Sequence, residues 1–188
     1  MIFETIITTQ SPQGQLHIAP MGIREELGLV VLAPFKPSKT LDNVLSSGYA
    51  VQNFCDDVRV FAGCVTGIKR DWPTCAVIAL PGVRLLNSLG HSELKLARIE
   101  DHVERPKLFC ERIHNESHGP FRGFNRAQAA VIEGAVLVSR LNMLSQEKIE
   151  NEWRYLTIAI EKTAGPIELE AWGWLQVKID QYREKIKL

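Results

Sequence analysis

The sequence predicts a mainly β protein with helices toward its C-terminal end: a β-barrel in residues 1–121 and a three-helix extension in residues 122–188. Short apolar segments alternate with tight turns through the first part, which favours a barrel over a parallel α/β sheet. After His118-Gly-Pro the strand signal does not return, and apolar residues recur at helical spacing. These observations divide the chain into a β part and an α part.

The β part is expected to begin with strands and one short helix. We predict strands at 2–9, 17–24, 29–33, 49–54 and 58–66. A turn at Ser11-Pro-Gln-Gly and another at Glu25-Glu-Leu-Gly separate the first three strands. A helix is predicted at 41–47, because Ser38 or Thr40 can cap its start and Gly48 ends it.

The rest of the β part has a weaker pattern. Residues 67–81 show no periodicity, and Trp72-Pro73 cannot continue a helix. Residues 83–89 are expected to form a helical turn. Two antiparallel strands, at 92–104 and 107–115, are predicted on either side of Arg105-Pro106.

Three helices are predicted for the extension. Asn125 is the expected N-cap of a helix from 126 to 144 that is apolar around most of its circumference. Ser145 opens a second helix, and Gly165-Pro166 separates it from a third. The apolar stripes of these two helices include Ile149, Trp153, Leu156, Ile160, Leu169, Trp172, Ile179 and Tyr182. We expect the three helices to pack on one another, on the barrel or on a second subunit.

Charge and composition exclude some partners. Lys plus Arg and Asp plus Glu both number 22, so no global field favours nucleic acid or an anionic membrane. No apolar run reaches membrane-spanning length, and the first residues lack the basic start of a signal peptide. We therefore expect a cytoplasmic, soluble protein whose four cysteines are reduced thiols.

One short stretch has the character of an anion site. Lys36, Ser38, Lys39 and Thr40 surround the start of the predicted helix, where unpaired N–H groups and the positive end of the helix dipole face outward. Such a helix start favours a phosphate. The competing interpretation is that Ser38 or Thr40 only caps the helix while the lysines are solvated.

Several motifs, taken together, resemble one family. They are Ala19-Pro20-Met21-Gly22, then Ser38-Lys-Thr40-Leu-Asp-Asn43, then an apolar strand that ends in Asn53-Phe, and His118-Gly-Pro-Phe-Arg-Gly-Phe-Asn-Arg126. The chain resembles the flavin reductase-like FMN-binding split-barrel superfamily, and more closely its DUF447-type branch of uncharacterised proteins. The resemblance implies a Greek-key split β-barrel, bound FMN and a homodimer with flavin near the subunit interface.

The resemblance also implies roles for individual residues. Ala19, Pro20, Met21 and Gly22 would line the isoalloxazine ring, and Gly22 stands where flavin reductases more often carry serine. Lys36, Ser38, Lys39 and Thr40 would hold the phosphate. Asn43 and Asn53 would bind the ribityl chain or the ring edge, or would pair with local backbone. His17 is either an acid or hydrogen-bond donor beside the ring or a structural histidine.

Two functional classes follow from the resemblance: a flavin-dependent oxidoreductase or flavin reductase acting on a small molecule, and an FMN-binding protein without turnover. A third class is a metal-dependent enzyme that uses Cys110, His114 and His118, which recur every four residues. In a strand the first two of these residues share a face and the third lies in a turn, so we expect no metal site there. Arg122, Asn125 and Arg126 either reach a ligand or only cap a helix.

Overall fold

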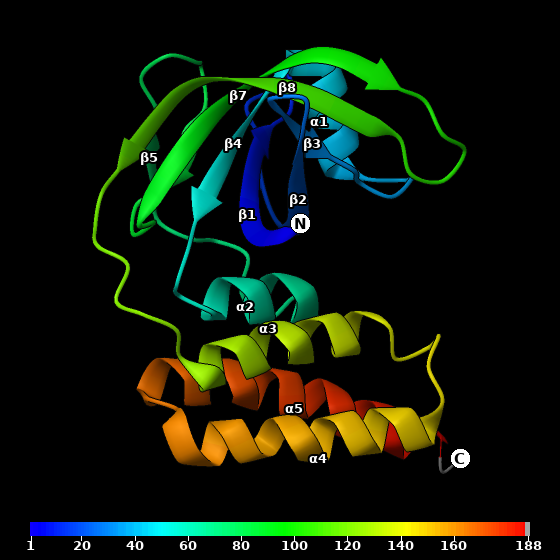
Figure 1. Ribbon diagram of the computed structural model, residues 1–188. Helices are drawn as coiled ribbons and strands as arrows, with labels where there is room; N and C mark the ends of the chain where they lie inside the picture. Colours follow the sequence, from blue (N-terminus) through cyan, green and yellow to red (C-terminus); the bar gives the residue numbers. More distant parts are fainter. Residues whose placement is uncertain (187–188) are drawn as a thin grey trace. The chain divides into compact units, whose positions relative to one another are not determined.

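The barrel closes because strand β1 pairs with a neighbour along each of its two edges. The computed structural model describes residues 1–186, and within them six strands follow one another around the barrel in the order β1-β2-β3-β8-β7-β4 (Figure 1). All pairs are antiparallel. Their bounds are β1 Phe3–Gln10, β2 Leu16–Glu26, β3 Leu29–Leu32, β4 Tyr49–Phe54, β7 Gly90–Glu100 and β8 Lys107–Ser117. The predicted barrel is therefore confirmed.

Alternation along the strands fills the barrel interior with aliphatic side chains. The interior cluster contains Ile7, Ile23, Val30, Leu32, Ala50, Leu94, Leu108 and Cys110. Helix α1, Lys39–Ser47, adds Leu41 and Val44 to the same cluster. The sequence predicts this helix two residues too short at its start. It ends at Gly48, whose φ of 78° is the left-handed conformation that glycine adopts readily.

A short two-stranded sheet covers part of the outer face of the barrel. It consists of β5, Thr74–Ala76, and β6, Val83–Leu85, where the sequence predicts an irregular segment and a helical turn. Asn53 of β4 connects it to the barrel: its Oδ1 accepts a hydrogen bond of 2.7 Å from the Leu85 N–H. Its amide nitrogen donates to the Ile6 carbonyl and to the Thr8 hydroxyl of β1. One buried side chain thus ties three strands together.

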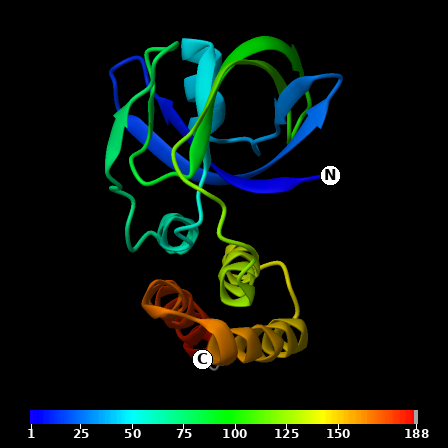
Figure 2. The ribbon, with the colours of Figure 1, turned by 60° about the vertical axis from the view of Figure 1, so that its left-hand side comes forward.

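The helices other than α1 form a second unit with a separate core. By their contacts, Met1–Cys55 and Trp72–Phe121 make one unit, and Asp56–Asp71 joins the chain from Arg122 onward in the other. The helices of this second unit are α2 Arg59–Thr66, α3 Arg126–Ser139, α4 Gln146–Thr163 and α5 Pro166–Ile186. Helices α3, α4 and α5 lie side by side (Figure 2). The N-caps Asn125 and Ser145 are confirmed, since both side chains accept hydrogen bonds from the first turn. Across residues 1–186, every helix falls short of the length and apolarity that a bilayer crossing requires.

The prediction of a strand at residues 58–66 is wrong, because this segment is helix α2. Val58, Ala62 and Val65 recur at helical spacing and pack in the cluster that also contains residues of α3 and α5. The β-branched residues suggested a strand, but the apolar stripe decides the structure. The sequence division at 121/122 places this segment with the barrel, whereas its contacts lie with the helices.

Close packing at Gly134 of α3 predicts a stability difference between two glycines of the helical unit. A Cβ atom at Gly134 would lie 2.9 Å from Trp172 and 3.2 Å from Leu175, whereas nothing lies within 4 Å of a Cβ atom at Gly173 in α5. Trp172 cannot yield easily, since it stacks on Trp153 with 3.9 Å between ring centroids. We expect Gly134→Val to lower the free energy of unfolding by about 1–3 kcal/mol through overpacking.

The matched control is Gly173→Ala, which should raise the free energy of unfolding by about 0.5–1 kcal/mol because alanine favours the helix. Urea unfolding followed by circular dichroism measures both changes. Equal effects of the two substitutions would contradict the packing described for Gly134.

Candidate functional site

The start of α1 has the features expected of an anion site. Ser38 is the N-cap, with its Oγ accepting a hydrogen bond of 3.4 Å from the Leu41 N–H. Lys39 is exposed in the first turn, and Thr40 is buried. The capping interpretation of Ser38 is therefore correct, and it coexists with the outward-facing helix start. Asp42, also in the first turn, is an exposed carboxylate that weakens the positive end.

Two further cations lie at this loop, and one of them was missed from the sequence. Lys36 pairs with Asp101 at 2.7 Å between Nζ and Oδ1, so its charge is partly engaged. Arg105, from the turn between β7 and β8, donates a 2.7 Å hydrogen bond to the Ala33 carbonyl and lies over the Phe35 ring. The sequence predicted the turn that contains Arg105. It did not predict that β3 pairs with β8, and this pairing places Arg105 beside the loop before α1.

The segment from His17 to Gly22 lies along β2, and its side chains divide between two faces. His17, Ala19 and Met21 alternate with Pro20 and Gly22, and Met21 packs against the barrel core. A ligand along this strand would meet main-chain groups and only every second side chain. The space that a Cβ atom would need at Gly22 is occupied by two side chains. They are Ile2, which precedes β1, and Glu4, which lies in β1.

The two asparagines have different settings. Asn43 of α1 donates a 3.0 Å hydrogen bond to the Thr9 hydroxyl, and Thr9 pairs with His17 across β1 and β2. The structure therefore brings α1 and the His17 end of β2 together. Asn53 is fully buried, and its amide donates and accepts within the protein. Its backbone-pairing interpretation is the one that the structure supports.

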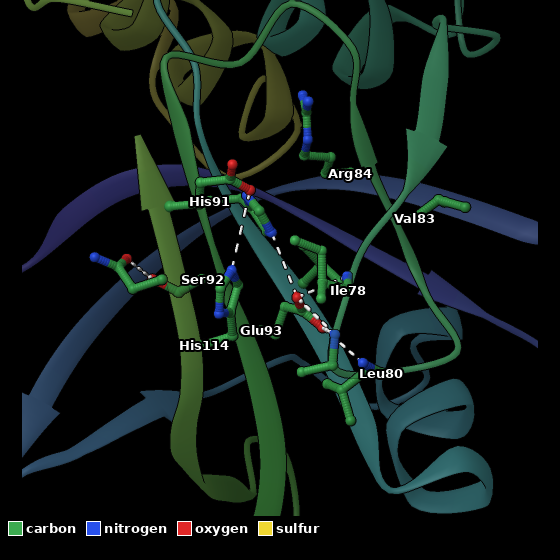
Figure 3. Close-up of polar contacts among 12 residues, drawn as sticks. Ile78, Leu80, Val83, Arg84, His91, Ser92, Glu93 and His114 are labelled. Atoms are coloured by element: carbon green, nitrogen blue, oxygen red, sulfur yellow. Dashed lines mark hydrogen bonds and ion pairs between the residues drawn. The ribbon is translucent and has the colours of Figure 1, made fainter. Parts of the chain in front are cut away.

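A group of polar side chains lies on the outer face of β7 and β8 (Figure 3). Glu93 of β7 has no exposed surface, and its carboxylate accepts hydrogen bonds of 2.7–3.1 Å from the N–H groups of Ile78, Ala79 and Leu80. His91 of β7 points toward the same carboxylate, with 3.6 Å between Nε2 and Oε1. His114 of β8 is paired with Glu93 across the strands.

Burial and hydrogen bonding set the ionisation of this group. Burial alone would raise the pKa of Glu93, but the three backbone N–H groups outweigh it and leave that pKa below its ordinary value. Burial, together with the nearby His118, lowers the pKa of His91. At neutral pH the group therefore combines a carboxylate with a neutral imidazole.

The proposed metal set of Cys110, His114 and His118 is not formed. A β-bulge in β8 causes this: Glu93 pairs with His114 and Leu94 with Arg112, so Ile113 is the extra residue. The bulge reverses the alternation, and Cys110 faces the barrel core while His114 faces outward. Burial raises the pKa of the Cys110 thiol to about 12. The sequence pattern indicated His114 and His118 in this region but gave no signal for His91 and Glu93.

The remaining polar candidates belong to the helical unit. The Asn125 side chain accepts hydrogen bonds from the Ala127 and Gln128 N–H groups and donates one to the Thr163 carbonyl. Its amide therefore caps the start of α3 and joins it to the end of α4. Arg122 and Arg126 are exposed. Arg59 forms ion pairs with Asp57 and Glu170, a network within the unit.

Comparison with known families identifies both parts of the chain. Residues 3–119 match the family model described as the N-terminal domain of a protein of unknown function, DUF447, and residues 125–176 match the DUF447 model that follows it. No curated protein sequence matches the chain.

Solved structures share the fold. An FMN-bound DUF447 protein of Methanosarcina mazei, MM1853, is 19% identical, with a TM-score of 0.82 over 94% of both chains. The 2-nitrobenzoate 2-nitroreductase NbaA of Pseudomonas fluorescens is 20% identical, with a TM-score of 0.53 over 61% of this chain and 64% of its own. A flavin reductase-like protein with a split barrel domain from Shewanella frigidimarina is 14% identical, with a TM-score of 0.55 over 66% and 74%. The fold is therefore the split barrel.

Burial of Cys110 predicts unequal reactivity among the four thiols. Iodoacetamide at pH 8 should leave Cys110 unmodified in the native protein, because the thiol is buried and its pKa is about 12. Cys55, Cys64 and Cys75 are partly exposed and should react faster. Mass spectrometry of tryptic peptides measures each site, and labelling in urea provides the control. Native labelling of Cys110 at the rate of the others would contradict its place in the core.

Proposed function

The chain belongs to the DUF447 family, and from this premise we propose that it binds FMN and uses it for redox chemistry on a small molecule. The observation that carries the proposal is the likeness, along nearly the whole chain, to an FMN-bound member of the same family. Nitroreductase and flavin reductase-like neighbours support a redox role. FMN supplies electron transfer, and the protein supplies binding and orientation.

The phosphate would lie at the start of α1. The helix begins there with outward N–H groups, and Lys39 and the Thr40 backbone stand in its first turn. Lys36 and Arg105 add positive charge at the preceding loop. These donors fit a phosphate better than a neutral ligand, because charge-assisted hydrogen bonds favour an anion.

The isoalloxazine would lie along β2. Main-chain groups of Ala19, Pro20 and Met21 would face its polar edge, with His17 and Asn43 toward the α1 end. Gly22 offers no hydroxyl, so any hydrogen bond at this position comes from the backbone. The protein's own groups thus orient the ring, and no acid or base is needed from the chain for a hydride to reach it.

We further propose that the protein is a homodimer, the arrangement that would complete a shared flavin site. The helical unit carries large apolar side chains that its own core does not cover: Tyr155, Ile158, Leu169 and Val177 are 75%, 44%, 54% and 46% exposed. Such a surface is typical of a subunit contact.

Lys39 provides the first test of the phosphate site. Lys39→Gln should weaken FMN binding by about 1–3 kcal/mol, as expected for the loss of a charge-assisted contact, and should leave riboflavin binding unchanged. Fluorescence titration of the apoprotein with both ligands measures this.

The matched control for Lys39 is Lys95→Gln. Lys95 is an exposed lysine of β7, and its neighbour Leu96 bonds to Gly48 at the opposite end of α1. This variant should bind FMN as the wild type does. Equal weakening for FMN and riboflavin in Lys39→Gln would refute the phosphate assignment.

Redox activity is tested by anaerobic mixing of FMN-loaded protein with NADH or NADPH. We expect the flavin absorbance to bleach much faster than for free FMN, because the bound ring is held for hydride transfer. Free FMN with denatured protein is the control. Unchanged absorbance would leave an FMN-binding protein without nicotinamide-dependent turnover.

The oligomeric state is tested by light scattering at micromolar concentration. We expect twice the mass of the chain, because the exposed apolar side chains of α4 and α5 would be covered in a dimer. A monomer mass with FMN still bound would contradict the shared site.

A further inference from the structure

We propose that His91, Glu93 and His114 form a binding site for one divalent transition-metal ion, with Zn²⁺ as the fitting probe. One ligand atom from each of these side chains lies within 4.8 Å of the others. Tetrahedral zinc with bonds of about 2.0–2.1 Å would require separations of about 3.3 Å, so small side-chain rotations complete the geometry. The pair His91 Nε2 and Glu93 Oε1, at 3.6 Å, is already close to that value.

Two ring nitrogens at this place have a carboxylate nearby but no hydrogen bond in the described part of the chain: His91 Nε2 is 3.6 Å from Glu93 Oε1, and His114 Nε2 is 4.0 Å from Glu116 Oε2. His91 Nε2 and His114 Nε2 are buried and have no hydrogen bond from any of residues 1–186. His91 is 1% exposed, and its Nε2 points at the Glu93 carboxylate (Figure 3). A buried polar atom without a partner has a free-energy cost, which a bound cation would remove.

The Glu93 carboxylate turns one of its oxygens, Oε1, toward His91. Oε2 accepts the two shorter hydrogen bonds, from Leu80 at 2.7 Å and Ala79 at 2.9 Å. Oε1 accepts from Ile78 at 3.0 Å and shares the Ala79 N–H at 3.1 Å. Oε1 therefore holds the longer bonds, and it is the oxygen at which a cation beside His91 would bind.

His118 lies next to Nδ1 of His91, the ring nitrogen that would not bind the metal. His91 Nδ1 lies 2.9 Å from His118 Nε2, and the two rings are stacked within 9°. Ligating histidines almost always donate their other ring N–H to an acceptor, which fixes the tautomer and the ring orientation, and here the acceptor would be His118 Nε2. When Nδ1 of His91 carries the proton, Nε2 presents a lone pair toward Glu93.

A proton is the alternative occupant. In the other tautomer His91 Nε2–H would face Glu93, but 3.6 Å is longer than a hydrogen bond. Two imidazoles and one carboxylate match the donor set of many zinc sites that retain an open position. The arrangement therefore favours a metal ion over a shared proton.

The test uses the full chain, treated with a chelator and dialysed, with its flavin content recorded. Zn²⁺ is titrated in competition with a chromophoric chelator, and bound metal is counted by mass spectrometry. We expect one Zn²⁺ per chain and a Zn²⁺-dependent rise in Tm by linkage. His114→Ala should weaken binding at least about a hundredfold, since loss of an outer partner alone costs about 10–100-fold.

The test needs a variant that still folds and a second variant that distinguishes the two candidate ligand sets. The His114 side chain is 32% exposed, so its truncation is tolerable, whereas His91→Ala risks unfolding. Glu116→Gln separates this site from the rival set His91, Glu116 and His118, and it is a strict contrast because Glu116 Oε2 lies only 4.0 Å from His114 Nε2. It should bind Zn²⁺ as the wild type does.

Three results would overturn the proposal. They are no stoichiometric Zn²⁺ on the wild type, equal affinity of His114→Ala and wild type, and loss of binding in Glu116→Gln. Because flavin content is measured in the same samples, failure of FMN binding would be seen separately and would leave the metal result intact.

Discussion

The rest of the structure depends on the pairing of β1 with both β2 and β4. Because the barrel has no free strand edge, other elements can pack only on its ends and its outer face. Helix α1 adds Leu41 and Val44 to the core inside the barrel. Along each strand, side chains then alternate between the barrel interior and the outer face. The polar side of β4 and β7 carries Asn53, His91 and Glu93, which are buried because the β5–β6 segment lies over them.

Buried polar side chains, rather than apolar contacts alone, hold that covering segment. Glu93 receives three backbone N–H groups from residues 78–80, and Asn53 receives one from Leu85. In a low-dielectric setting these bonds are strong, and an unmade one is costly. Specificity of the fold and the chemistry of the outer face therefore arise from the same few residues.

The sequence predicted the barrel, α1 and the three C-terminal helices because periodicity and caps report local structure directly. It failed at α2, where Val58 and its β-branched neighbours suggested a strand and the deciding packing partners lie far along the chain. It placed Cys110 with His114 because a one-residue bulge leaves no signal in the alternation. His91 and Glu93 were missed for a related reason: a buried polar strand residue is visible only once its covering segment is known.

The helical unit is interleaved with the barrel in the chain. Residues 56–71 leave the barrel, contribute Val58 and Ala62 to the helical core, and return before Trp72. A protein cut after residue 121 would retain α2 and expose the apolar stripe that α3 and α5 cover. The two units are thus not separable modules, because neither can be transferred, lost or acquired by a single genetic breakpoint. Substitutions in α2 are constrained by a core whose remaining members lie between Ala127 and Ile179.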